Sequence, residues 1–190
     1  IGYIRVTSFN KTVEDNVLKA LADLKKENKD KELSGLVLDL RNNPGGLLDQ
    51  AVKLSDLFLN KGDIVSTKGR NESQNQVYKA TEGDVLNGKP IVVLINSGSA
   101  SASEIASAAL KDHKRAIVMG TKTFGKGSVQ TVIPLSGNAG MKLTTALYYT
   151  PNNETIQAKG VTPDIEVKQA KLEELKYDIT FSESSLNGHL

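Results

Sequence analysis

Four serines fall within ten residues in the segment 96–105, which reads NSGSASASEI. The segment follows the apolar run IVVLI and precedes an alanine-rich stretch with the spacing of a helix. A serine at a sharp turn from strand to helix has an exposed hydroxyl, and the helix N-terminus presents unpaired N–H groups that stabilise a developing oxyanion. Serine and glycine are also common as simple helix caps. The cluster therefore holds either a nucleophile or a plain cap.

A nucleophilic serine needs a base, and histidine is the usual one. The chain has only two histidines, His113 and His189, and it has no cysteine. His113 lies at the far end of the helix predicted after the serines, and at about 1.5 Å of rise per residue it would be roughly 18 Å from Ser101. His189 belongs to the trailing segment. A serine enzyme with this sequence would therefore use a lysine as its base.

A lysine is present on the glycine-rich loop 120–128, GTKTFGKGS. The loop nearly matches the phosphate-binding pattern GxxxxGKS/T, but Gly127 stands where that pattern requires a hydroxyl. The next residues, SVQTVIPL, are typical of a strand, so no helix N-terminus follows to hold phosphates. We expect no nucleotide here, and Lys126 is free to act as a general base. Lysine accepts a proton only when it is neutral, and apolar neighbours such as Phe124 would favour the neutral form.

A third candidate is the segment 39–46, DLRNNPGG, which ends a predicted buried strand. Its adjacent glycines can present backbone N–H groups to an anion, and they can equally form an ordinary turn.

These candidates must be positioned by alternating strands and helices. Apolar runs predict strands at 2–9, 35–40, 90–95 and 116–120, and helical spacing predicts helices at 13–24, 47–57 and 103–112. Such alternation implies crossover connections and a mostly parallel sheet. Two predicted hairpins, 63–69 with 75–80 and 127–135 with 140–150, add antiparallel strands. The sequence therefore predicts an α/β fold.

Composition excludes several classes of protein. Hydrophobic residues make up 38% of the 190 residues and charged residues 24%, which is typical of a globular domain. The net charge of +2 gives no electrostatic reason to expect nucleic acid or a membrane surface as a partner. No apolar stretch approaches the roughly 18 residues that would predict insertion into a bilayer.

Four motifs together resemble the carboxy-terminal processing peptidases, also called tail-specific proteases. The motifs are DLRNNPGG, GSASASEI, GTKTFGKGSVQ and LTTALYYTPNNETIQAKGVTPDI, and the resemblance covers residues 1–167. It implies that Ser101 is the nucleophile and that Lys126, 25 residues later, is the base. It also implies that Gln130 assists the lysine, and that the fold is the spiral α/β core shared by Clp-type proteases and crotonases.

The same resemblance implies an oxyanion hole made of backbone N–H groups. One comes from the glycine turn, at Gly45 or Gly46, and another from Ala102 after the nucleophile. The implied reaction needs no metal and no cofactor. The implied substrates are proteins or peptides with apolar C-termini, the implied location is periplasmic or exported, and a homo-oligomer is possible.

The resemblance also predicts how the chain is divided. Residues 1–167 are expected to form a protease core, and 168–190 a polar tail that leads to a missing C-terminal part. No segment of the sequence corresponds to the PDZ domain with which the family captures C-termini.

Two other functions are compatible with the superfold. A crotonase-like acyl-CoA enzyme would use the Gly-Gly turn to polarise a thioester, but Glu104 has no second carboxylate placed beside it by the pattern. A non-catalytic peptide-binding core would be expected to lack Ser101 or Lys126, and both are present.

Overall fold

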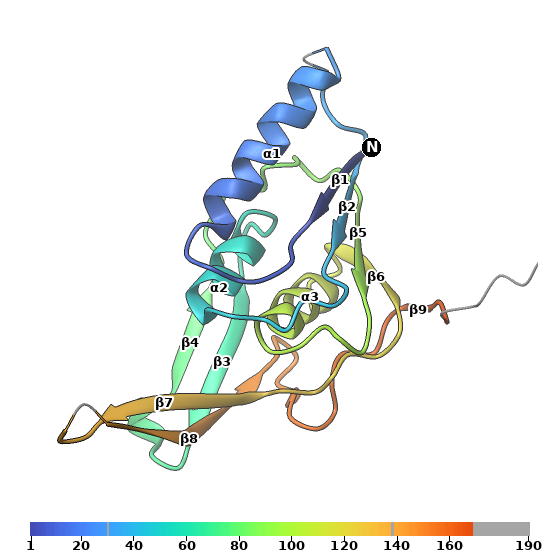
Figure 1. The fold of residues 1–190 in the computed structure, drawn as a ribbon. Coiled ribbons are helices and arrows are strands. Elements are labelled where there is room, and N and C mark those ends of the chain that lie inside the picture. The colour runs from blue at the N-terminus through green and yellow to red at the C-terminus, as the bar shows by residue number, and fades with distance from the viewer. Residues whose placement is uncertain (30, 138, 169–190) are drawn as a thin grey trace, which may run out of the picture.

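The computed structural model describes residues 1–29, 31–137 and 139–168, and Figure 1 shows their arrangement. The predicted tail at 168–190 therefore lies, apart from Lys168, outside the described residues. Within the described ranges, no helix has both the length and the hydropathy needed to cross a bilayer.

A five-stranded parallel sheet forms the larger layer, in the order β1-β2-β5-β6-β9. Its strands are β1 (Gly2–Arg5), β2 (Leu36–Asp39), β5 (Ile91–Ile95), β6 (Ala116–Gly120) and β9 (Ile165–Glu166). Each connection from β1 to β2, from β2 to β5 and from β5 to β6 contains a helix. This is the crossover arrangement that the alternating pattern predicts.

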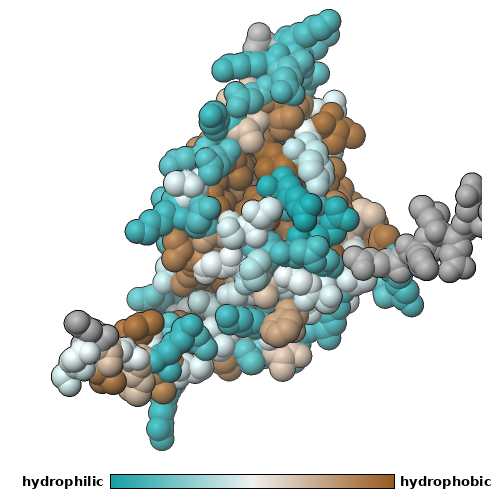
Figure 2. Space-filling view, in the orientation of Figure 1, coloured by the Kyte–Doolittle hydropathy of each residue, from teal (hydrophilic) through white to brown (hydrophobic). Residues whose placement is uncertain are grey.

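Three helices lie on one side of this sheet: α1 (Val13–Glu27), α2 (Leu48–Asp56) and α3 (Ala102–Asp112) (Figure 1). Alternate strand residues, including Ile4, Leu38 and Val93, point toward the helices and are buried in the core. Figure 2 shows the amphipathic character of α1, with hydrophilic residues outward and hydrophobic residues gathered beside it over the strands. The hydrophobic effect of this burial holds the helices against the sheet.

The other face of the parallel sheet is much less covered. The residues paired across it in one row are Tyr3, Val37, Val92 and Ile117, and Tyr3 and Ile117 are 52% and 50% exposed. The next row contains Arg5, Asp39, Leu94 and Met119. Parallel sheets usually have helices on both faces, so the exposure of these apolar side chains distinguishes this sheet.

An antiparallel sheet forms the second layer, in the order β4-β3-β8-β7. Its strands are β3 (Asp63–Gly69), β4 (Gln76–Lys79), β7 (Ser128–Pro134) and β8 (Gly140–Tyr149), and a short 3₁₀ helix, η1 (Glu72–Gln74), lies between β3 and β4. The β7–β8 hairpin extends away from the core (Figure 1). Both predicted hairpins and the α/β class are confirmed.

Candidate active site

Ser101 lies in the turn between β5 and α3, immediately before the first residue of the helix. Its backbone has φ 54° and ψ −114°, a region that non-glycine residues rarely occupy. The sharp turn leaves the serine half-buried while its neighbours on both sides are buried. A partly exposed serine at a strand-to-helix turn is the arrangement that a nucleophile requires.

The neighbouring serines have structural roles instead. The Ser99 hydroxyl is fully buried, donates to the Leu40 carbonyl oxygen at 2.7 Å and accepts from the Asn96 N–H at 3.1 Å. The Ser103 hydroxyl is also fully buried and donates to the Asn43 carbonyl oxygen at 2.9 Å. Both hydroxyls are thus engaged, and Ser101 is the better candidate for chemistry.

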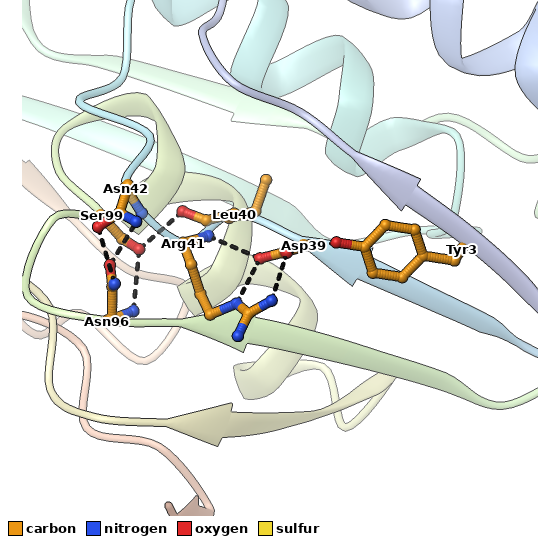
Figure 3. Close-up of polar contacts among 7 residues, drawn as sticks. All are labelled: Tyr3, Asp39, Leu40, Arg41, Asn42, Asn96 and Ser99. Carbon is orange, nitrogen blue, oxygen red and sulfur yellow. Dashed lines mark hydrogen bonds and ion pairs between the residues drawn. The ribbon is translucent and has the colours of Figure 1, made fainter. Parts of the chain in front are cut away.

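A pair of asparagines clamps the glycine turn against the serine loop (Figure 3). The Asn42 N–H donates to Asn96 Oδ1, and Asn96 Nδ2 donates to Asn42 Oδ1, both at 2.9 Å. The Ala100 N–H donates to the Asn43 carbonyl oxygen at 3.0 Å. These bonds join segments more than 50 residues apart in sequence and fix the two loops to each other.

The glycine turn packs directly on the serine elbow. Gly45 has φ 97°, and a Cβ atom added to it would lie 2.8 Å from Ser101 Cβ and 2.9 Å from the Ala102 nitrogen. Only glycine allows this approach, because a side chain would overlap the elbow and strain the backbone. Gly46 has φ 149°, and an added Cβ would lie 2.2 Å from the Phe9 carbonyl oxygen.

The three expected oxyanion donors differ in their engagement. The Gly45 N–H donates to Asn43 Oδ1 at 2.9 Å, within a buried hydrogen bond. The hydrogen bonds of the described residues include none from the N–H of Gly46 or Ala102. Ala102 is the first residue of α3, where backbone N–H groups have no partner within the helix.

Glu104 connects the serine elbow to the lysine loop. Its carboxylate is fully buried, and Oε2 accepts from the Ser101 N–H and the Lys126 N–H, both at 2.8 Å. Oε1 accepts from the Thr123 hydroxyl and the Gly125 N–H, both at 2.6 Å. Four donors thus share one carboxylate, and two of them belong to the predicted nucleophile and base.

From the sequence, Glu104 was expected only as half of an acid pair. The pattern Ser101-x-x-Glu104 is that of a capping box, in which the carboxylate accepts from the N–H of the capping residue. That signal accounts for the bond to Ser101. The bonds to the lysine loop could not be found from sequence, because that loop lies about 20 residues away along the chain.

Lys126 and Gln130 present exposed side chains. Phe124, which was expected to shield the lysine, is 70% exposed, so the expected apolar environment is not formed within the described residues. The described hydrogen bonds and ion pairs include none that joins the Lys126 amine to Ser101, to Gln130 or to a carboxylate. The structure therefore brings the Lys126 backbone to the serine elbow and leaves its side chain open to solvent.

The loop that contains Gln157 and Val161 packs against the lysine loop. The Val161 N–H donates to Thr123 Oγ1 at 2.6 Å, and the Gly127 N–H donates to Gln157 Oε1 at 3.0 Å. A Cβ added at Gly127 would lie 2.3 Å from the Gln157 nitrogen, so the two loops are in direct backbone contact.

His113 lies at the end of α3 that is opposite the serine, as predicted. Its Nε2 is 2.7 Å from the Asp63 carbonyl oxygen, on β3. Within the described ranges, no three His, Asp or Glu side chains are grouped in a way that could hold a metal ion.

A model of peptidase family S41 matches residues 1–167. The chain belongs to peptidase family S41. It is 53% identical over 191 aligned residues to the carboxy-terminal-processing protease of Bartonella bacilliformis, an alignment that covers 100% of this chain and 44% of that protein. It is 40% identical to the carboxy-terminal processing protease CtpA of Bacillus subtilis, over 95% of this chain and 38% of that protein.

Among solved structures, the photosystem II D1 C-terminal processing protease is similar, with a TM-score of 0.77 and 39% identity. That match covers 87% of this chain and 42% of the other. These S41 similarities confirm the resemblance to carboxy-terminal processing peptidases and the α/β fold with a Clp protease/crotonase-like core. The chain spans less than half of the length of these relatives.

One further polar cluster lies at the start of the glycine turn. Asp39 is fully buried, and it accepts from Arg41 Nε and Nη2 at 2.9 and 2.8 Å and from the Tyr3 hydroxyl at 2.6 Å. Burial alone would raise the pKa of Asp39, but the hydrogen bonds from Arg41 and Tyr3 outweigh it and hold that pKa at about 2. The Asp39 carboxylate is thus charged at any physiological pH.

Proposed function

We propose that this chain is the core of a serine endopeptidase that cleaves proteins near their C-termini. The observation that carries the proposal is the elbow at Ser101, where the half-buried serine lies against Gly45 and next to the unengaged backbone N–H of Ala102. Membership of peptidase family S41 and the carboxy-terminal processing proteases among the relatives support the same reaction.

In the proposed reaction, Ser101 Oγ attacks the carbonyl carbon of the scissile peptide. Neutral Lys126 takes the proton from the hydroxyl and gives it to the leaving amine, and Gln130 orients the lysine by hydrogen bonding. Water then attacks the acyl-enzyme and releases the new C-terminus. No metal or cofactor takes part.

The oxyanion of the tetrahedral intermediate would be held by backbone N–H groups. Of the two glycines of the turn, Gly46 is favoured over Gly45, because the Gly45 N–H already donates to Asn43. Ala102 supplies the second donor from the first turn of α3, where the helix dipole also favours negative charge.

Protein substrates with apolar C-termini, a periplasmic or exported location and a homo-oligomer are parts of the same proposal. They derive from the family resemblance. The bound polypeptide would also cover Phe124 and Lys126, which are exposed in the described structure.

The acyl-CoA alternative has less support. A crotonase-like hydratase would need a carboxylate free to exchange protons with its substrate. The Glu104 carboxylate instead accepts four hydrogen bonds from the protein and is fully buried.

The test is to incubate the chain with an unfolded protein that has an apolar C-terminus and to identify new termini by mass spectrometry. We expect new termini near the C-terminus, and we expect Ser101→Ala to abolish them. Ser97→Ala, an exposed serine of the same loop, is the matched control and should retain the activity. Cleavage by Ser101→Ala at the rate of the unmodified chain would show that Ser101 is not the nucleophile.

A further inference from the structure

We propose that a groove beside Arg41, at the C-terminal edge of the parallel sheet, binds the terminal carboxylate of a polypeptide and its apolar last side chain. The groove is defined by Arg41, Leu94, Asn96, Met119, Thr121, Val167 and Lys168, with Ile95 and Gly120 completing its lining. The inference rests on the proposed function and names a substrate feature that the core itself would recognise.

Arg41 is fixed in place in a way that surface arginines usually are not. Two of its guanidinium nitrogens donate to the two oxygens of Asp39, and its own backbone N–H donates to Asp39 Oδ1 at 3.0 Å. The third guanidinium nitrogen points away from Asp39 (Figure 3), and the side chain is 46% exposed. A guanidinium held in this way keeps N–H donors directed outward, and it loses little conformational entropy when it binds a second carboxylate.

The groove that Arg41 lines has the volume and the lining for one residue at the end of a chain. Its volume is about 300 Å³, and apolar walls come from Leu94, Met119 and Val167. Leu94 and Met119 are register partners on the open face of the sheet, so the groove continues the exposed apolar row there. Asn96 and Thr121 are the polar uncharged residues of the lining.

The charges around the groove favour an anion. Arg41 and Lys168 both line it, and the only carboxylate bound to Arg41 among the described residues, Asp39, already accepts from Arg41 and Tyr3. An apolar wall next to a fixed cation suits a residue that carries both a carboxylate and an apolar side chain. In a polypeptide, only a C-terminal residue combines these two features, which is why we assign the α-carboxylate rather than an Asp or Glu side chain.

The position of the groove relates it to the candidate active site. Ligands of open parallel sheets bind beyond the C-terminal ends of the strands, and this groove lies at the ends of β2, β5 and β6. Arg41 belongs to the turn that carries Gly45 and Gly46, and Asn96 both lines the groove and clamps that turn. A C-terminus held there would be close to the serine loop along the same edge of the sheet.

The experiment measures binding in the Ser101→Ala chain, so that cleavage cannot change the ligand. The probe is a fluorescein-labelled hexapeptide that ends in leucine, prepared with a free C-terminus and as the C-terminal amide. Fluorescence anisotropy should give about tenfold tighter binding for the free acid, the usual advantage of a charge-assisted hydrogen bond. An amidated peptide with aspartate at its last position should bind no better than the leucine amide.

Two variants test the assignment to this groove. Arg41→Gln should remove the preference for the acid, but it also leaves Asp39 without its main partner and can weaken the fold. Thr121→Glu places a negative charge in the lining of the groove and leaves Asp39 and Arg41 themselves unchanged, and it should remove the preference in a folded chain. Gln76→Glu, the same change of charge on the exposed strand β4, should leave the preference intact.

The outcomes separate this inference from the proposed function. Equal binding of acid and amide, or an acid preference that survives Thr121→Glu, would overturn the carboxylate groove. Tighter binding of the aspartate amide than of the leucine acid would also overturn it in favour of a side-chain carboxylate site. If the Ser101→Ala chain binds the acid and the amide equally, but Ser101-dependent cleavage is still found by mass spectrometry, only the groove fails and the protease assignment stands.

Discussion

Ser101 and Lys126 are held by the same carboxylate, yet the fold constrains the serine far more than the lysine. The serine elbow is packed against Gly45, flanked by buried serines and tied to the glycine turn by the two asparagines. The lysine loop shares Glu104 with that elbow through backbone N–H groups, and its side chains Phe124 and Lys126 are exposed.

The serine elbow and the lysine loop therefore contribute different parts of the proposed active site. The serine elbow and the backbone N–H groups proposed as oxyanion donors are positioned by the fold of the described residues. The position of the lysine backbone is also fixed, but the desolvation that favours a neutral amine has to come from whatever covers the loop. Substitutions of the buried residues that fix the serine elbow should therefore change both stability and activity, whereas substitutions of the Lys126 side chain should change activity alone.

The largest expected effect is that of Lys126→Arg. A guanidinium is not deprotonated in proteins, so this variant cannot act as a base and should be as inactive as Lys126→Ala. We expect a loss in cleavage rate on the order of 1000-fold, within the range for general acid–base catalysis. The free energy of unfolding should change by less than about 0.5 kcal/mol, since the side chain is exposed.

Cleavage rates from a peptide assay and urea unfolding curves, measured on the same samples, check this pair of statements. Gln130→Ala is the comparison variant and should lose only part of the activity. If Lys126→Arg cleaves at close to the normal rate, the lysine is not a proton acceptor and the proposed mechanism is wrong.

Glu104→Gln should have the next largest effect, and it should fall on stability. Whichever way the amide is oriented, its NH₂ group faces two donors, either those of Ser101 and Lys126 or those of Thr123 and Gly125. Loss of these charge-assisted bonds should lower the free energy of unfolding by about 3 kcal/mol. Activity should fall as well, because both loops lose their common anchor.

Urea unfolding at pH 7 measures the change, and Glu27→Gln is the control with the same change of charge at an exposed position of α1. The control should stay within about 0.5 kcal/mol of the unmodified chain. Equal unfolding midpoints for the two variants would mean that the Glu104 network does not hold the loops.

The smallest of the three effects is a pH dependence of the free energy of unfolding, which comes from Asp39 at the start of the glycine turn. The pKa of Asp39 is lowered from 3.8 to about 2, so the stabilisation is present above about pH 4 and is lost as the pH falls toward 2. A depression of this size corresponds to about 2 kcal/mol of the free energy of unfolding.

Urea unfolding curves between pH 5 and pH 2 should show this loss in the unmodified chain and a shallower one in Asp39→Asn. Asp23→Asn, at an exposed position on α1, should retain the full acid dependence. An unchanged slope in Asp39→Asn would place the acid-sensitive group elsewhere.

Several features of the molecule were determined by local sequence. The alternation of apolar runs and helical spacing predicted the α/β class, because burial of one face imposes its period on each strand and helix. The turn chemistry of RNNPGG and NSGSASA marked both loops of the candidate site.

Other features were decided by the tertiary structure alone. Sequence could not separate Gly45 from Gly46, because the Asn43 side chain that engages the Gly45 N–H is held by a long-range hydrogen bond to the Val6 carbonyl oxygen at 2.7 Å. It could not assign Glu104 to the lysine loop or predict the exposure of Phe124, since both depend on packing between segments about 20 residues apart or more. Periodic patterns record which face of an element is buried, whereas hydrogen bonds between loops depend on the three-dimensional positions that the packed elements give them.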